Sequence, residues 1–105
     1  MYFEIEKYKK KYGEVKLKYA LQRTEVSNIL EEQGFEYVEE KNRYIKEINK
    51  KAYASVLLRD EMLLFELQNK SGESLVTDAY QYNTIGDFLN WFEIINNDLL
   101  ENSIF

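Results

Sequence analysis

The clearest pattern of apolar and polar positions lies near the end of the chain. From Ile85 onward, apolar residues recur at the spacing of one face of an α-helix. Thr84, followed three residues later by Asp87, resembles a capping box with Asp in place of the usual Glu. The pattern predicts a long amphipathic helix over residues 85–101, with Trp91 near its middle as an anchor. The predicted core positions are Ile85, Phe88, Leu89, Phe92, Ile95 and Leu99.

The first 21 residues alternate instead. Residues 14–21 have apolar side chains at every second position, as in a half-buried strand, and so do the residues around Phe3 and Ile5. With a loop at 11–13, whose glycine can adopt a positive φ, this alternation predicts a β-hairpin. Val15 and the alternate residues Leu17, Tyr19 and Leu21 would then face the core.

A helix over residues 2–12 is the competing interpretation of the same stretch. Ile5, Tyr8 and Tyr12 also fit a helical stripe, and Gly13 fits the residue at which a helix ends. The hairpin is the preferred prediction because its outer positions also pair glutamates with lysines across the strands.

The middle of the chain predicts one short helix. Thr24 offers a hydroxyl for an N-cap, and Val26, Ile29 and Leu30 have the spacing of a buried helical face. Gly34 then suits the left-handed conformation that follows a helix. We therefore expect a helix over about residues 25–33.

Strands are expected on both sides of two turns in the next segment. Residues 35–38 and 43–48 predict one hairpin, and residues 52–58 and 62–67 predict another. The second pair also fits a single helix, so this alternative stays open. After a loop at 70–73, the run from Leu75 to Tyr82 predicts a last strand.

These elements predict an α+β fold: an antiparallel β-sheet of about five to seven strands in hairpins, with two helices packed on one face. A chain of 105 residues has the usual size of one domain, so we expect a single domain over residues 1–105. No apolar run approaches the length of a bilayer span, and no secretory signal opens the chain. A cytoplasmic protein without a membrane partner is expected.

Composition removes several kinds of chemistry. The chain has neither Cys nor His, which excludes disulfides, thiolate or imidazole metal ligands, and nucleophiles that depend on Cys or His. Glu14 and Lys16 have the spacing of a nuclease motif, but the predicted hairpin places both on its open face. Glu66, in an apolar run, fits the outward position of a strand. The residues predict no catalytic site, no metal and no cofactor, and hence a protein that is not an enzyme.

The charge is unevenly distributed. The formal net charge is -5, and no basic residue follows Lys70, whereas six acidic residues do. A surface of one sign speeds encounter with a partner of the opposite sign, although it also serves solubility alone. The nine tyrosines exceed what a small core can hold, and tyrosine is common at interfaces.

Together these features favour a non-enzymatic protein that inhibits a partner by occupying its basic nucleic-acid-binding site. A phage-type anti-defence or anti-CRISPR protein, or an immunity protein against a nuclease, has this general character. The partner would be a basic protein, such as a nucleic-acid-handling enzyme or effector complex. The predicted partner-binding residues are Glu31, Glu32, Glu39, Glu40, Asp78, Tyr80, Tyr82, Asp87, Glu93, Asp98 and Glu101.

The alternative is a nucleic-acid-binding or regulatory module that uses the lysine-rich stretch from Lys7 to Tyr19. Lysines would contact phosphates and tyrosines would stack on bases. The acidic balance of the whole chain argues against direct nucleic-acid binding, because such modules are usually basic overall. The residues for this alternative are Lys9, Lys10, Lys11, Lys16, Tyr8 and Tyr12.

Overall fold

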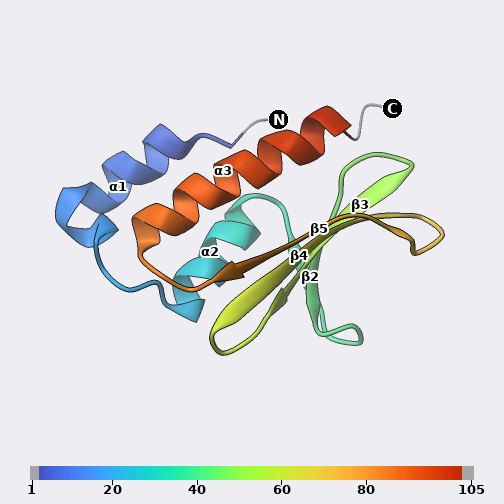
Figure 1. Ribbon diagram of the computed structural model, residues 1–105, viewed down its shortest axis with the longest axis horizontal. Helices are drawn as coiled ribbons and strands as arrows, with labels where there is room; N and C mark the ends of the chain where they lie inside the picture. Colours follow the sequence, from blue (N-terminus) through green and yellow to red (C-terminus); the bar gives the residue numbers. More distant parts are fainter. Residues whose placement is uncertain (1–2, 103–105) are drawn as a thin grey trace.

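The computed structural model describes residues 3–102 of the chain, with side chains as far as Asp98. It has an α+β fold in which five antiparallel strands form one sheet in the order β1-β2-β3-β4-β5. Three helices cover one side of this sheet (Figure 1). The elements are α1 (Ile5–Leu17), α2 (Arg23–Glu32), β1 (Glu36–Val38), β2 (Arg43–Glu47), β3 (Ala52–Leu58), β4 (Met62–Asn69), β5 (Ser74–Gln81) and α3 (Ile85–Asn102).

The α+β class and the antiparallel sheet are confirmed, but the count of two helices is wrong. The hairpin predicted for the first 21 residues is replaced by α1. Ile5 and Tyr8 are buried on one side of this helix, whereas Val15 is 71% exposed and Tyr19 is 57% exposed. The helical stripe prevails because Ile5 and Tyr8 lie in the same buried cluster as residues of α2 and α3.

Gly13 interrupts α1 at a kink between two helical pieces, at the place where the competing interpretation expects a helix to end. Its φ of 81° is outside the helical region, yet the helix resumes and continues to Leu17. The residues after α1 then form backbone hydrogen bonds with the residues at the start of α3. The Leu21 N–H donates to the Asn83 carbonyl oxygen (2.7 Å), and the Ile85 N–H donates to the Tyr19 carbonyl oxygen (3.0 Å). The end of the segment in which apolar and polar residues alternate, residues 19–21, therefore pairs with a distant part of the chain, residues 83–85, and not with the first residues.

Helix α2 lies where the sequence predicts it, with Val26, Ile29 and Leu30 buried. The predicted capping by Thr24 is wrong. Gln22 is the N-cap residue, and no side chain caps this helix. Thr24 already lies within the first turn, so its hydroxyl does not occupy the capping position.

The three-residue turn at the end of α2 confirms the role predicted for glycine. Gly34 has a φ of 91°, which glycine adopts without a steric penalty. The Phe35 N–H donates to the Leu30 carbonyl oxygen (2.9 Å), so the chain folds back onto the helix and buries Phe35.

Both predicted hairpins and the last strand are present in the sheet. Strands β3 and β4 pair along their length, with Val56 opposite Phe65, which excludes a single helix over residues 52–67. Side chains alternate between the two faces, so Leu63, Phe65 and Leu67 of β4 are buried beneath the helices.

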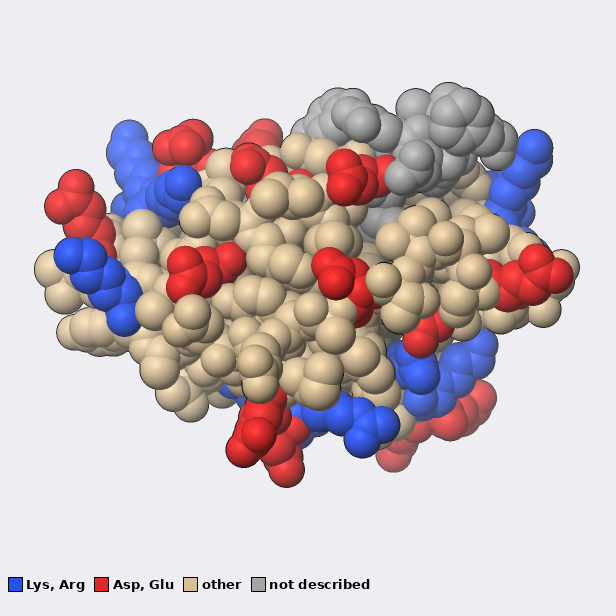
Figure 2. Space-filling view, viewed as in Figure 1, with Lys and Arg blue, Asp and Glu red and all other residues tan. Residues whose placement is uncertain are grey.

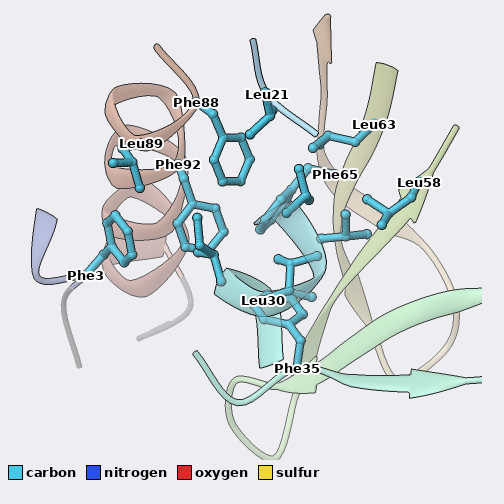
Figure 3. Close-up of a cluster of buried hydrophobic side chains, with 14 of the residues drawn as sticks. Phe3, Leu21, Leu30, Phe35, Leu58, Leu63, Phe65, Phe88, Leu89 and Phe92 are labelled. Atoms are coloured by element: carbon cyan, nitrogen blue, oxygen red, sulfur yellow. The ribbon is translucent and has the colours of Figure 1, made fainter. Parts of the chain in front are cut away.

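Helix α3 supplies the centre of the core. Its first turn is capped as predicted, since the Asp87 N–H donates to Thr84 Oγ1 (3.1 Å). Phe92 is fully buried and lies among aromatic rings from α3, β4 and the segments before α1 and after α2 (Figure 3). The predicted core position Leu99 lies outside the described side chains.

A glycine allows α3 to approach α1 closely. A Cβ atom added at Gly86 would lie 3.1 Å from the carbonyl oxygen of Leu17, tighter than an ordinary contact.

Among the described residues, no helix is long and apolar enough to cross a bilayer.

Candidate functional site

An exposed stripe runs along the outer side of α3. Asp87, Ile94 and Asp98 are exposed, and their spacing of seven and four residues places them on one face of the helix. Ile94 is 60% exposed. Asn97 is half-buried, and the side chain of Glu101, a predicted partner-binding residue, lies outside the described residues.

The stripe borders a contact between α3 and β5. Trp91 is half-buried, and its indole N–H donates to Asp78 Oδ2 (3.0 Å). The other oxygen of Asp78 accepts a hydrogen bond from the Ala79 N–H (2.9 Å). The ring of Tyr80 lies 4.9 Å from the ring of Trp91, between centroids. We call Asp78, Tyr80, Asp87, Trp91, Ile94 and Asp98 the α3–β5 surface.

Tyr80 links this contact to the start of α3. Burial, and secondly the nearby negative charge of Asp87, raises the pKa of Tyr80 from 10.0 to about 12. The phenol therefore stays neutral at physiological pH. Its hydroxyl oxygen is buried and has no hydrogen-bond partner among the described residues.

The acidic side chains of the α3–β5 surface are not neutralised by basic ones. Asp78, Asp87 and Asp98 form no ion pair within the described part of the chain, and neither does the predicted residue Glu93, which is half-buried on α3 outside this surface. Figure 2 shows acidic side chains across the middle of the face that carries α3, with Lys and Arg toward its margins. The ion pairs that occur are Lys11–Glu32, Arg23–Asp60, Arg43–Glu66 and Lys70–Glu47.

The remaining predicted partner-binding residues lie elsewhere. Glu31 and Glu32 end α2, and Glu39 and Glu40 are exposed in the turn between β1 and β2, at the opposite edge of the sheet from β5. The structure therefore brings together only part of the predicted acidic set.

Tyr82 also lies apart from Tyr80. Burial raises its pKa, the positive charge of Arg23 lowers it, and the negative charge of Asp60 raises it. Arg23 and Asp60 form an ion pair between the start of α2 and the turn between β3 and β4. Tyr82 therefore belongs to that corner of the molecule.

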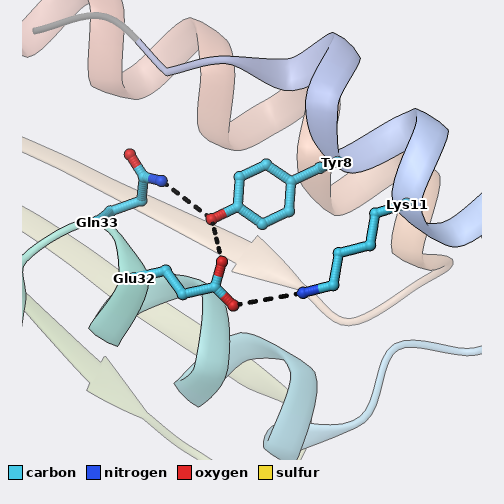
Figure 4. Close-up of polar contacts among 4 residues, drawn as sticks. All are labelled: Tyr8, Lys11, Glu32 and Gln33. Carbon is cyan, nitrogen blue, oxygen red and sulfur yellow. Dashed lines mark hydrogen bonds and ion pairs between the residues drawn. The ribbon is translucent and has the colours of Figure 1, made fainter.

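Residues of the basic alternative are partly engaged in internal contacts. Tyr8 is only 5% exposed, and its hydroxyl donates to Glu32 Oε2 (2.8 Å) and accepts from Gln33 Nε2 (3.0 Å) (Figure 4). Lys11 Nζ lies 3.6 Å from Glu32 Oε1. Tyr12 packs against the core. Both tyrosine rings of this stretch therefore turn toward the protein interior.

The lysines of the same stretch stay near solvent. Lys10 and Lys16 are exposed, and Lys9 is half-buried. The ammonium of Lys16 lies 5.8 Å from the centroid of the Tyr12 ring. These lysines surround α1 on several sides and do not form one basic stripe with free aromatic rings.

The two carboxylates considered for catalysis have ordinary surroundings. Glu14 and Lys16 are exposed at the end of α1. Glu66 lies on the open face of the sheet, where it pairs with Arg43 (3.6 Å) and accepts a hydrogen bond from Ser74 Oγ (2.9 Å). Within residues 3–98, no three acidic side chains cluster in a way that would hold a metal ion.

Comparison of the chain with known protein families, curated proteins and solved structures gives no match. Functional inference for this chain therefore depends on its own residues and their geometry.

Sequence reasoning missed the bond between Trp91 and Asp78. A signal for it exists, because Asp78 occupies an inward position of a strand between two other inward residues, Val76 and Tyr80. A carboxylate at such a position needs a hydrogen-bond donor from the layer above.

Proposed function

We propose that this protein is a non-enzymatic binding protein that uses the α3–β5 surface to occupy a basic site on another protein. The observation that carries the proposal is that Asp78, Asp87 and Asp98, on one surface, form no ion pair among the described residues, whereas Glu32, Glu47, Asp60 and Glu66 are each paired with Lys or Arg. A patch of unpaired negative charge accelerates encounter with a positively charged partner and disfavours acidic ones.

The same surface has the side chains that concentrate binding energy at protein interfaces. Trp91 and Tyr80 present large rings, and Ile94 adds an exposed apolar side chain between the charges. Aromatic and Arg side chains dominate interface energetics, and a cation over a Trp or Tyr ring gains about 0.5–2 kcal/mol. An Arg-rich site on the partner fits both the charge and the rings.

A basic site that normally holds nucleic acid is the target that we propose. Carboxylates spaced along a helix can take the positions of phosphates, so the protein would inhibit by competition. An anti-defence or anti-CRISPR protein, or an immunity protein against a nuclease, would work in this way.

The test is affinity capture from nuclease-treated lysate with a pair of variants of equal charge. The surface variant is Asp87→Asn with Asp98→Lys, which avoids a positive charge at the start of α3. The matched control is Glu39→Gln with Glu40→Lys, in the exposed turn at the far edge of the sheet.

A basic protein retained by the wild type and the control, but lost with the surface variant, supports the proposal. Its binding should weaken with added salt and should shift the emission of Trp91, the single tryptophan of the chain. Equal loss of binding by both variants would show that binding depends on the net charge of the protein and not on the α3–β5 surface. Recovery from untreated lysate that is lost after nuclease treatment would instead favour the lysines of α1.

A further inference from the structure

A groove lies on the side of the molecule formed by α1, the end of α2 and the end of β2. Its volume is about 720 Å³, within the range of roughly 300–1,000 Å³ that is usual for small-molecule sites. It shares no residue with the α3–β5 surface. Its charged lining residues are Glu4, Lys7, Lys11, Glu32, Lys46 and Glu47.

One wall of the groove is held in place by hydrogen bonds. Glu32 receives the Tyr8 hydroxyl at one oxygen and the Lys11 ammonium at the other, and Gln33 donates to the same hydroxyl (Figure 4). Tyr8 is buried, so this network ties α1 to α2. The carboxylate of Glu32 is therefore already neutralised and is not free to bind a cation.

A second carboxylate of the groove is also neutralised. Glu47 lies 3.4 Å from the ammonium of Lys70, measured from Oε2 to Nζ. Of the acidic lining residues, Glu4 is then the one without an ion pair among the described residues, and it is exposed.

Lys46 differs from the ion-paired carboxylates Glu32 and Glu47. It is half-buried, lines the groove, and forms no ion pair within the part of the chain that the structure describes. Its ammonium lies 5.8 Å from the centroid of the Phe35 ring. Burial lowers the pKa of Lys46, because removal from water disfavours the charged form. Lys7, which is exposed, adds a second ammonium without an ion pair among the residues that the structure describes.

The stem of Lys46 lies beside Gly34. A Cβ atom at Gly34 would lie 3.7 Å from Cε of Lys46, so the lysine stem passes directly over the glycine backbone. The apolar part of the lining includes Ile48. The groove thus combines a half-buried ammonium (Lys46) and an exposed one (Lys7), neither in an ion pair among the described residues, with an apolar side chain.

We propose that this groove binds a small organic anion, a carboxylate or phosphate monoester attached to an apolar group, with Lys46 as its main charged contact. Lys7 makes the second contact with the anionic group, and the apolar group lies against Ile48. Such a ligand compensates the charge of a half-buried ammonium, whereas a cationic ligand would meet two ammonium groups. This site is independent of the proposed function at the α3–β5 surface.

The test is a titration of the ¹⁵N-labelled full chain, followed by amide NMR shifts. The probes are phenyl phosphate and benzoate, with inorganic phosphate to test the apolar part and benzylamine to test the charge. We expect saturable shifts at Gly34, Lys46 and Ile48 with one or both aromatic anions, which also distinguishes phosphate from carboxylate.

Variants decide whether Lys46 is the contact. Lys46→Met keeps the apolar stem, and Lys46→Gln keeps a polar end; each should weaken binding by about tenfold or more. Lys10→Gln, an exposed position of α1 outside the groove, is the matched control and should bind as the wild type does.

Three results would overturn the proposal: no saturable shift with either aromatic anion, equal weakening by Lys10→Gln, or benzylamine binding as tightly as the anions. Inorganic phosphate binding as tightly as phenyl phosphate would overturn the apolar part. Spectra of the free variants that overlay on the wild type establish that each variant is folded.

Discussion

Phe92 is the side chain through which the aromatic core of this protein is best tested. It is fully buried, and its ring centroid lies 4.9 Å from that of Phe3 and 5.8 Å from that of Phe88. The rings of Phe65 and Phe35 are 6.4 and 6.5 Å away. One residue of α3 therefore contacts rings from four different parts of the chain.

The size of the effect follows from these contacts. Phe92→Ala should lower the free energy of unfolding by about 3–5 kcal/mol, the usual cost of removing a buried Phe. Domains of this size are commonly stable by only about 5–15 kcal/mol, so this variant would be marginal. Phe92→Leu fills more of the space and replaces the aromatic contacts by aliphatic ones, so we expect a smaller cost of about 1–2 kcal/mol. Ile94→Ala, two residues away but exposed, should change stability by less than about 0.5 kcal/mol.

The assay is urea unfolding followed by circular dichroism and by Trp91 fluorescence. The midpoint should fall for Phe92→Leu with an unchanged slope, because the surface exposed on unfolding is nearly the same. If Ile94→Ala cost as much as Phe92→Leu, or if Phe92→Ala cost less than about 1 kcal/mol, the assignment of buried and exposed faces of α3 would be refuted.

Other predictions concern ionisation, helix packing and the contact between α3 and β5. Burial is the main cause that raises the pKa of both Tyr8 and Tyr80 from 10.0 to about 12. As the pH rises, these tyrosines therefore ionise in the unfolded chain before they ionise in the folded protein. The free energy of unfolding should be constant below about pH 9 and fall between about pH 10 and 12. Ultraviolet titration should show at least two of the nine tyrosines ionising late, since burial also raises the pKa of Tyr12 and Tyr82, and ionisation of all near pH 10 would contradict this. Gly86→Val should lower the melting temperature, because the valine side chain would clash with the carbonyl oxygen of Leu17 in α1. An unchanged melting temperature would show that α1 and α3 can move apart without loss of stability. Asp78→Ala removes the acceptor of the Trp91 indole N–H, so the fluorescence emission of the folded protein should change, whereas an identical spectrum would argue against this bond.

The acidic residues of the candidate surface could be listed from the sequence, but their grouping could not. Asp78 and Asp87 come together because β5 and α3 pack against each other, and Trp91 joins them through its indole N–H. Glu39 and Glu40 have the same chemistry but lie in a turn at the other edge of the sheet. Strand order, which depends on contacts between distant segments, separates the two groups.

The sequence by itself determined the elements whose pattern had one interpretation. The helical spacing around Phe88 and Phe92 fits only a helix, so α3 is where it was predicted. Residues 52–67 also fitted a single helix, and it is the pairing of β3 with β4 that decided for the hairpin. Tertiary structure decided the first 21 residues, because the alternation around Val15 and the helical stripe of Tyr8 are both local patterns and neither is decisive. The helix prevails because it buries Tyr8 and lets its hydroxyl form hydrogen bonds with Glu32 and Gln33, 24 and 25 residues away. The residues next to Tyr8 in the sequence do not indicate these distant contacts.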